Sequence, residues 1–371
     1  MLRSELAKLV KGLMAPPAPG APATDLTVAP STADDAAKVL RFASEHGMRV
    51  LFWGGGTHQA YGYPVDPDLV MSTQALNKVV DWQPEDLTIV VEAGLPVADV
   101  EAQLEQRGQT AVLPEDVPGA TVGGVIASGL SGWRRLRYGP TRDRVIEAVI
   151  ATGDGRVVRG GGRLVKNVTG YDLPRLATGS FGSFGLVTSV CLKLWPLTAE
   201  RAMLEVESPE TALALAYRPD AVIETNDRTV VFLAGTGEEI AAQEARIGGR
   251  IVSGHRWPER MAGLYELVLR VPVGLVATAV MQIRQSGWPF QAAHGVGEIR
   301  IALETVADGE LSQLREWAEA AGGVLVVAAA PDDNGFDPWG TPPDALDLQR
   351  RVKAAFDPRG IANPGILPGG I

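Results

Sequence analysis

Apolar positions in the first half of the chain switch between helical and strand spacing. A helical pattern opens at Pro30 and Ser31 and ends at Gly47, where another apolar run begins. Apolar runs predict strands over residues 49–53, 88–92, 145–152 and 186–194. Asp154-Gly155 is a turn signal that predicts a hairpin after the third of these strands. Because helices, hairpins and crossovers are mixed, the pattern indicates an α+β fold.

Beyond Thr198 the pattern changes to single helices and strands with few glycine clusters. An amphipathic helix is predicted over 311–321, a strand over 324–328, and a last helix that stops at Asp357-Pro358. The chain has 371 residues, more than one hydrophobic core usually fills. The sequence therefore predicts a second domain of about 150 residues.

The N-terminus combines a short helical pattern with a stiff connector. Leu2, Leu6, Leu9 and Leu13 recur at helical spacing, and the proline-rich stretch APPAPGAPAT follows from Ala15. This pattern predicts an appended helix. Two interpretations are open: the helix lies on its own domain, or it docks on a partner.

Composition narrows the class of protein. A net charge of -10 and a pI near 5.1 argue against sequence-independent binding of nucleic acid. The single cysteine, Cys191, can form neither an intrachain disulfide nor an iron–sulfur cluster, and is expected to be a buried strand residue. The best membrane-span candidate, residues 271–281, is shorter than the roughly 20 residues that a span needs. Charged residues interrupt any N-terminal signal sequence, so we expect a cytoplasmic protein without a direct membrane span.

Three glycine-rich segments carry the candidate chemistry. Gly54 to Thr57 directly follow a predicted strand, so successive backbone N–H groups could converge on a diphosphate. The segment has neither the GxGxxG spacing of dinucleotide-binding folds nor the GK[ST] ending of a P-loop. The stretch PEDVPGATVGGVIASGLSG from Pro114 has few large side chains, which would let a flat ring lie against the backbone, and GSFGSFGLV from Gly179 is a third such edge. Structural turns and close helix packing remain the alternatives for these glycines.

The order of these segments resembles the FAD-binding domain of the vanillyl-alcohol-oxidase family, the PCMH-type FAD-binding flavoproteins. The resemblance is carried by VAPSTADDAAKVLRFASEHGMRVLFWGGGT, ATVGGVIASG, RYGPTRDRVIEAVIATGDGRVV and GYDLPRLATGSFGSFGLVTSVCLKLWP. The closing FDPRGIANPGIL is also similar to the end of family members. Within the family, RLVKNVTGYDLPRL and Arg142-Asp143 look most like the E subunits of glycolate oxidase complexes.

The resemblance implies a domain order and a cofactor. It implies an N-terminal helix and connector over 1–24, a PCMH-type FAD-binding domain over 25–198, a second α+β cap domain over 199–350, and a segment over 351–371 that returns to the flavin. The second domain would hold an antiparallel sheet with helices and the substrate. Family members with covalent flavin have a histidine directly after the glycine pair, where this chain has Thr57, so non-covalent FAD is expected.

The resemblance also implies which residues contact FAD. They are small or polar residues of the three glycine-rich segments and their neighbours: Gly54, Gly55, Gly56, Thr57, His58, Gln59, Pro114, Thr121, Gly123, Gly124, Ala127, Ser128, Gly129, Tyr138 and Val187.

The catalytic residues are less well marked. Relatives that oxidise D-2-hydroxy acids have an HxGDGNxH segment, whereas this chain has AHGVGEIRI from Ala293, with His294 present and Arg300 in place of the second histidine. Arginine has no free lone pair, so no metal site is expected. His294 is a candidate base, or else a packed loop residue. Arg134 and Arg137 are candidates for clamping a substrate carboxylate, although this basic stretch could equally bind FAD phosphate, acidic neighbours or another subunit.

Together these features predict an FAD-binding subunit of a complex that oxidises glycolate to glyoxylate. Electrons would leave through a second FAD-containing glycolate oxidase subunit and an iron–sulfur subunit, and any membrane association would be made through these partners. Two alternatives remain: a non-catalytic structural flavoprotein subunit, or a stand-alone FAD-dependent 2-hydroxy-acid dehydrogenase.

Overall fold

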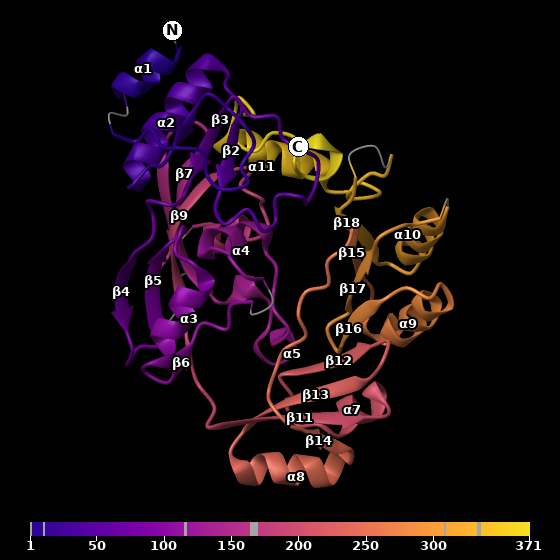
Figure 1. Ribbon diagram of the computed structural model, residues 1–371. Helices are drawn as coiled ribbons and strands as arrows, with labels where there is room; N and C mark the ends of the chain where they lie inside the picture. Colours follow the sequence, from indigo (N-terminus) through magenta and orange to yellow (C-terminus); the bar gives the residue numbers. More distant parts are fainter. Residues whose placement is uncertain (1, 10–11, 115–116, 164–169, 308, 332–334) are drawn as a thin grey trace.

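The computed structural model describes residues 2–9, 12–114, 117–163, 170–307, 309–331 and 335–371. These residues form two lobes that lie side by side, each built on its own sheets (Figure 1). The α+β fold expected from the sequence is confirmed. Residues 164–169 of the RLVKNVTGYDLPRL stretch lie outside the described residues.

The first lobe begins with a small parallel sheet in the order β1-β3-β2. Its strands are β1 (Thr27–Val28), β2 (Val50–Trp53) and β3 (Leu69–Ser72). Helix α2 (Ala33–His46) packs on the sheet. Its start is fixed by Thr32, whose side chain accepts the backbone N–H of Asp35, and its end by Gly47 at φ 65°.

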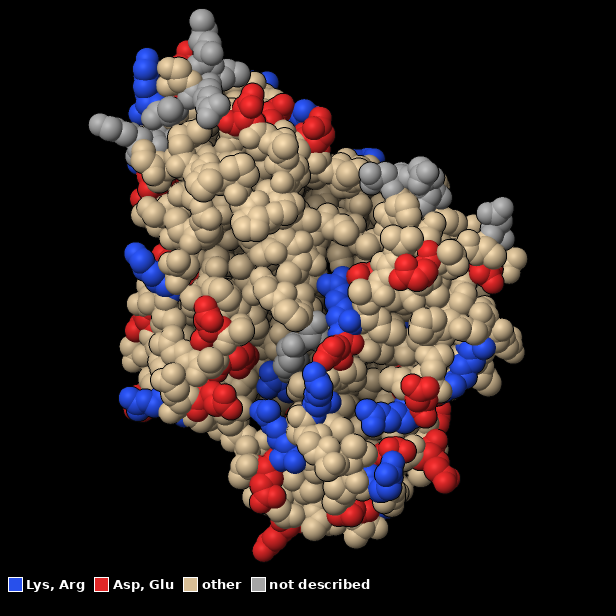
Figure 2. All heavy atoms as spheres, in the orientation of Figure 1, with Lys and Arg blue, Asp and Glu red and all other residues tan. Residues whose placement is uncertain are grey.

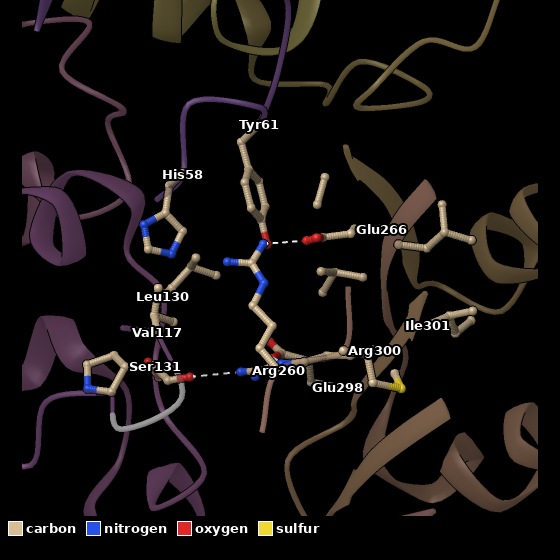
Figure 3. A pocket seen from close by; sticks show the side chains of 15 residues that line it. His58, Tyr61, Val117, Leu130, Ser131, Arg260, Glu266, Glu298, Arg300 and Ile301 are labelled. Carbon is tan, nitrogen blue, oxygen red and sulfur yellow. Dashed lines mark hydrogen bonds and ion pairs between the residues drawn. The ribbon is translucent and has the colours of Figure 1, made fainter. Parts of the chain in front are cut away.

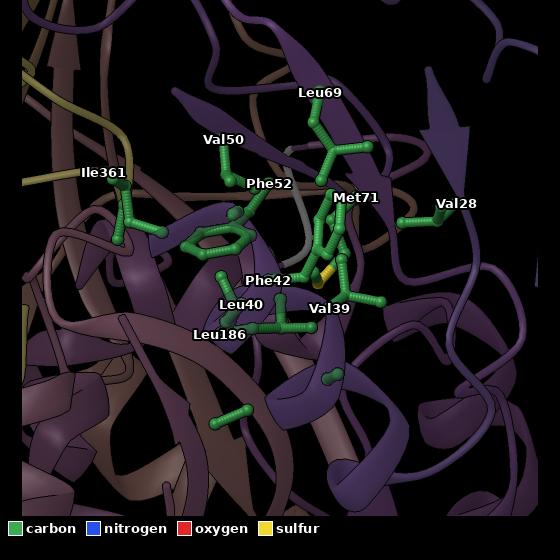
Figure 4. Packing of buried hydrophobic residues seen from close by; sticks show 14 of the residues in the cluster. Val28, Val39, Leu40, Phe42, Val50, Phe52, Leu69, Met71, Leu186 and Ile361 are labelled. Carbon is green, nitrogen blue, oxygen red and sulfur yellow. The ribbon is translucent and has the colours of Figure 1, made fainter. Parts of the chain in front are cut away.

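A buried apolar cluster joins α2 to this sheet (Figure 4). Val39 and Leu40 on α2 meet Val50 and Phe52 on β2 and Met71 on β3, and all five are almost fully buried. Full burial of each such side chain stabilises the fold by about 1.5–3 kcal/mol. This packing holds the end of β2 in place, from which the Gly54–Thr57 segment extends.

A five-stranded sheet completes the first lobe, in the order β4-β5-β9-β7-β8 and antiparallel throughout. Its strands are β4 (Val79–Gln83), β5 (Thr88–Glu92), β7 (Val145–Thr152), β8 (Val157–Gly161) and β9 (Gly185–Lys193). Gly155 has φ 77° in the turn between β7 and β8, so the predicted hairpin is present. Cys191 is buried in β9, as expected. Around the sheet lie α3 (Val97–Glu105), α4 (Val122–Ser128), α5 (Arg135–Tyr138), η1 (Thr141–Asp143), α6 (Leu173–Ala177) and the short pair β6 (Gln109–Thr110) and β10 (Trp195–Pro196).

The second lobe is one eight-stranded antiparallel sheet in the order β14-β11-β13-β12-β16-β17-β15-β18. Its strands are β11 (Glu200–Val206), β12 (Ala221–Thr225), β13 (Thr229–Gly235), β14 (Arg250–Val252), β15 (Tyr265–Arg270), β16 (Phe290–His294), β17 (Glu298–Leu303) and β18 (Val324–Ala329). Its helices are α7 (Pro209–Leu215), α8 (Gly237–Ile247), η2 (Val273–Leu275), α9 (Val276–Gln285) and α10 (Glu310–Ala320). The helices cover the face that is turned away from the first lobe, which leaves the other face directed toward it (Figure 1).

The two chain ends both pack on the first lobe. Leu6 of α1 (Leu2–Leu9) is fully buried in the α2 cluster, which favours the interpretation that this helix lies on its own domain. At the other end, α11 (Leu346–Phe356) leads into a segment that runs parallel to β2, where Val50 N–H donates to Ile361 O at 2.8 Å. The last turn is η3 (Pro368–Gly370).

We propose that the lobes divide at 198/199, because β10 is the last strand before the chain enters the eight-stranded sheet at β11. The expected division at 350/351 would cut α11, so we propose 345/346 for the start of the closing segment. In the described part of the chain, no helix is long and apolar enough to cross a membrane.

Candidate functional site

The three glycine-rich segments meet in one cavity of the first lobe, here called the glycine pocket. It is lined by Gly54 to Gln59 after β2, by α4, and by Gly182 to Val187 at the start of β9. Of the residues expected to contact FAD, twelve line it: Gly54, Gly55, Gly56, Thr57, His58, Gln59, Thr121, Gly123, Gly124, Ala127, Ser128 and Val187. The structure thus brings together most of the expected cofactor residues.

Two glycines of the first segment are needed for close contact between loops. A Cβ on Gly55 would lie 1.9 Å from the carbonyl oxygen of Gly119, and one on Gly54 would lie 2.4 Å from Thr121 Oγ1. Gly56 has φ +73°, which residues with a Cβ rarely adopt. These positions tie the loop after β2 to the segment that leads into α4, and so shape one wall of the pocket.

Helix α4 forms the next wall. Thr121 begins it by accepting the N–H of Gly124 at 3.3 Å, and Gly129 ends it at φ 66°. A Cβ on Gly123 would lie 2.6 Å from that of Ala93, so Gly123 is also needed for close packing beneath the pocket. The small-residue run therefore serves helix packing and also lines the cavity, and its contact with a flavin stays a prediction.

The chemistry of this lining fits a dinucleotide-sized anion such as the FAD diphosphate. No Asp or Glu is among the described residues that line the pocket, so the phosphates would meet no repelling carboxylate. Glycines line much of the pocket and carry no side chain that would keep a ligand from the backbone, and Phe181, Leu186 and Val187 supply apolar contacts.

Asn363, which was not predicted from the sequence, ties the closing segment to this pocket. Its Oδ1 accepts the N–H of Phe52 at 2.9 Å, and its Nδ2 donates to Phe181 O at 2.7 Å. It lies at φ 39°, a left-handed conformation that Asn tolerates better than most residues. The Asn-Pro pair in FDPRGIANPGIL was the available signal, since Asn before Pro marks a turn.

A second cavity, the charged pocket, lies between the two lobes and shares His58 with the glycine pocket (Figure 3). Arg260 crosses it: its Nη2 lies 2.5 Å from Glu266 Oε2 on β15, and its Nη1 donates to Thr57 O at 3.4 Å. One arginine thus joins the cap sheet to the glycine loop. On the face drawn in Figure 2, basic side chains gather along the line where the lobes meet.

A second arginine–glutamate pair, Arg300 with Glu298, also lines the charged pocket. Arg300 Nε donates to Glu298 Oε1 at 3.2 Å, its Nη2 donates to Ser131 O at 3.4 Å, and its guanidinium lies 4.1 Å from the Trp133 ring centre. Burial alone would raise the pKa of Glu298, but Arg300, Arg270 and Arg135 outweigh it and hold that pKa below the ordinary value. Glu298 is therefore ionised at neutral pH.

Comparisons with known proteins decide the family. The FAD binding domain family matches residues 24–161, and the C-terminal domain family of FAD linked oxidases matches residues 339–367. An uncharacterized FAD-linked oxidoreductase of Mycobacterium tuberculosis is 35% identical, over 92% of this chain and 90% of that protein. This chain belongs to the FAD-linked oxidoreductase family. It therefore has an FAD-binding domain, and most residues that line the glycine pocket lie within the matched range 24–161.

Other proteins that are similar to this chain carry more specific names. Glycolate oxidase subunit GlcE of Escherichia coli is 31% identical over 77% of this chain and 83% of that protein. Glycolate oxidase subunit GlcD of Bacillus subtilis is 36% identical over 54% of this chain, but the match takes in only 42% of GlcD. Among solved structures, alkyldihydroxyacetonephosphate synthase shares the fold with a TM-score of 0.64 at 14% identity, covering 91% of this chain and 75% of that one.

The three remaining residues that were expected to contact FAD do not line the glycine pocket. Pro114 lines the charged pocket, and Gly129 lines a groove that opens beside α4. Tyr138 packs edge-on against Trp195, with ring centres 5.7 Å apart, and lines neither pocket.

The two arginines proposed as a carboxylate clamp are also outside both pockets. Arg134 is buried and donates to Thr110 Oγ1 at 3.3 Å and Leu113 O at 3.4 Å. Arg137 pairs with Asp220 at 3.0 Å and donates to Ala234 O. Arg260 and Arg300 supply the positive charge of the charged pocket instead. Arg300 was noted in the sequence only as the replacement of a histidine, and Arg260 was missed because it lies far along the chain from the glycine segments.

His294 is buried at the end of β16 rather than in the charged pocket. Its Nε2 lies 2.7 Å from Glu224 Oε2, and the other Glu224 oxygen accepts Arg284 at 2.9 Å. Burial alone would raise the pKa of Glu224, but His294 and Arg284 outweigh it and hold that pKa below its ordinary value. Within the described ranges, no group of three or more His, Cys, Asp or Glu side chains could hold a metal ion.

Proposed function

We propose that the chain is an FAD-binding subunit of a complex that oxidises glycolate to glyoxylate and passes the electrons to partner subunits. The observation that carries this proposal is the junction of two cavities at His58: one free of carboxylates, and one holding two arginines. A flavin in the first would face a small carboxylate in the second. The resemblance to glycolate oxidase subunits over most of the chain supports the substrate class.

Bound non-covalently, FAD would accept a hydride from the substrate carbon. The chain's own residues would then bind and orient the substrate. Arg260 and Arg300 would attract the carboxylate. Burial raises the pKa of Tyr61, so its hydroxyl stays protonated and would donate to the substrate, while His58 would take the hydroxyl proton.

The flavin's electrons need an acceptor, and this need indicates the partner subunits. The whole sequence has one cysteine, which cannot hold an iron–sulfur cluster. A second FAD-containing subunit and an iron–sulfur subunit would therefore carry electrons away in a cytoplasmic complex, with any membrane association made through those subunits.

A second candidate is a structural flavoprotein subunit whose flavin stabilises the fold. It is favoured by the pairing of both arginines with Glu266 and Glu298, which neutralises the charge that a substrate carboxylate would use.

Coexpression with the neighbouring genes tests the proposal. The purified chain should be yellow and release FAD, not FMN, on heating. Alone it should oxidise glycolate slowly even with an artificial acceptor, whereas the assembled complex should be active. A complex that is active without this chain's flavin would establish the structural alternative, and a chain that cannot be loaded with FAD would contradict both.

A further inference from the structure

We propose that a groove beside the glycine pocket is the docking surface for the acidic face of an electron-accepting protein. This inference rests on the proposed function, because it assumes a bound flavin whose electrons leave the chain. The groove has a volume of about 720 Å³ and is here called the arginine groove. Among the residues that line it are Arg135, Arg142, Arg270, Ser128, Phe181 and Leu348.

The arginine groove lies directly beside the glycine pocket. Ser128 and Phe181 line both the arginine groove and the glycine pocket, so a single layer of residues separates the two cavities. Electrons can cross such a wall without any opening, whereas a substrate would need a continuous path. A protein seated in the groove would lie close enough to receive electrons from the flavin.

The arginine groove carries positive charge. Arg135, Arg142 and Arg270 line the groove, and no Asp or Glu does so in the described part of the chain. Arg135 and Arg270 share one carboxylate, Glu298, at 3.9 and 3.3 Å, which leaves donors of both guanidiniums unused by it. On a chain of net charge -10, this groove is a place where an acidic partner would be attracted rather than repelled.

The arginine groove also has an apolar wall. Leu348 on α11 is 52% exposed beside Val352, Leu367 and Pro368. Apolar side chains next to arginines are typical of protein interfaces, where arginine is enriched and the buried core is apolar. A small anion would gain nothing from this wall, so the combination favours a protein.

Two acceptor proteins of opposite charge test the proposal on the FAD-loaded full chain. The flavin is reduced with dithionite, and its oxidation by acidic cytochrome b5 is compared in stopped flow with oxidation by basic cytochrome c. Each ferric haem takes one electron, so two haems are reduced per flavin and the flavin's protons pass to solvent. We expect the rate with cytochrome b5 to fall steeply with ionic strength, and the rate with cytochrome c to lack this dependence.

A charge reversal in the groove supplies the decisive comparison. Arg142→Glu should slow the reaction with cytochrome b5 at low salt by about fivefold, because this arginine is exposed and its ion pair with Asp143 is long, at 3.9 Å. Arg159→Glu on β8 is the matched control, since Arg159 is similarly exposed but does not line the groove. It should change the rate by less than about 1.5-fold.

Three results would overturn the proposal. The first is an equal loss of rate with cytochrome b5 in Arg142→Glu and Arg159→Glu, and the second is a rate with cytochrome b5 that depends on ionic strength no more than the rate with cytochrome c. The third is that Arg142→Glu slows flavin oxidation by ferricyanide but not by cytochrome b5, which would assign the groove to small anions. Because dithionite replaces the substrate, these outcomes are independent of whether glycolate is oxidised. Failure to bind FAD would instead overturn the proposed function and this docking surface together.

Discussion

Arg260 and Glu266 face each other across the charged pocket, with Nη2 2.5 Å from Oε2, and this pair links the loop after β2 to the cap sheet. Both side chains are only about a quarter exposed or less, so the pair is held in a partly desolvated setting. A substrate carboxylate must therefore compete with Glu266 for the same guanidinium.

Glu266→Gln should strengthen the binding of glycolate or oxalate, because it removes the competing charge while keeping the side-chain shape. We expect about a tenfold lower Kd, equivalent to roughly 1.4 kcal/mol. Titration of the flavin absorbance measures it. Glu259→Gln is the control, since Glu259 is exposed and pairs with Arg256 outside the charged pocket. Unchanged affinity in Glu266→Gln would remove Arg260 as the carboxylate-binding residue.

Gly55→Val should abolish FAD binding. The new side chain would collide with the carbonyl oxygen of Gly119, only 1.9 Å from the Cβ position, and would displace the loop after β2. The FAD content of the purified protein reports the loss, and circular dichroism shows whether the fold survives. Gly274→Ala is the control, because no atom lies within 4 Å of its Cβ position. A folded Gly55→Val protein with full FAD content would contradict this account of the loop.

Much of the first lobe could be predicted from the sequence because its signals are local. The strand over 88–92 and the hairpin at Asp154-Gly155 follow from apolar runs and turn residues that lie next to each other in the chain. The glycine pocket could be predicted for the same reason, since the glycine clusters themselves form most of its walls.

The charged pocket could not be predicted, because it depends on how the lobes meet. Arg260 lies in a segment without regular structure, and Thr57 is 203 residues away in the chain. The basic stretch from Arg134 was the stronger sequence signal, yet those guanidiniums turn to Thr110 and Asp220 instead. Arg300 reaches the charged pocket through its place on β17, and Arg260 reaches it from a segment outside the strands, so no local pattern encodes their meeting.

His294→Ala should affect stability more than chemistry. His294 is buried against Glu224, so its loss would cost about 1–3 kcal/mol as this partly buried carboxylate loses one of its partners. Activity of the complex should fall by less than about 100-fold, and chelators should leave both flavin content and activity unchanged. Urea unfolding and turnover measure the two effects. Stoichiometric zinc or manganese, lost together with activity on chelation, would show that the second lobe carries out the oxidation.

Acid should weaken the junction of the lobes through Glu298. Three arginines hold its folded pKa below the ordinary value, so its contribution to stability is fully present above the unfolded pKa and is lost as pH falls through the folded pKa. The free energy of unfolding, measured from about pH 6 to pH 3, should fall less steeply in Glu298→Gln than in the parent. Parallel curves would mean that the carboxylate gains nothing from its arginines.

Lys353→Met tests how the closing segment supports the glycine pocket. Lys353 Nζ lies 3.0 Å from Asp357 Oδ2 and donates to Ser183 O and Ala362 O, while Asp357 accepts the N–H groups of Ile361 and Ala362. Removing the lysine leaves a buried carboxylate without its cation.

This loss should destabilise the fold by about 3–5 kcal/mol. It should also weaken FAD binding, because Asn363 follows directly and holds Phe52 and Phe181 at the pocket wall. Lys38→Met, at an exposed pair with Asp35, should cost less than about 1 kcal/mol and leave FAD affinity unchanged. Urea unfolding and FAD fluorescence titration measure both. If Lys353→Met is destabilised but binds FAD as tightly as the parent, the closing segment stabilises the lobe without shaping the cofactor site.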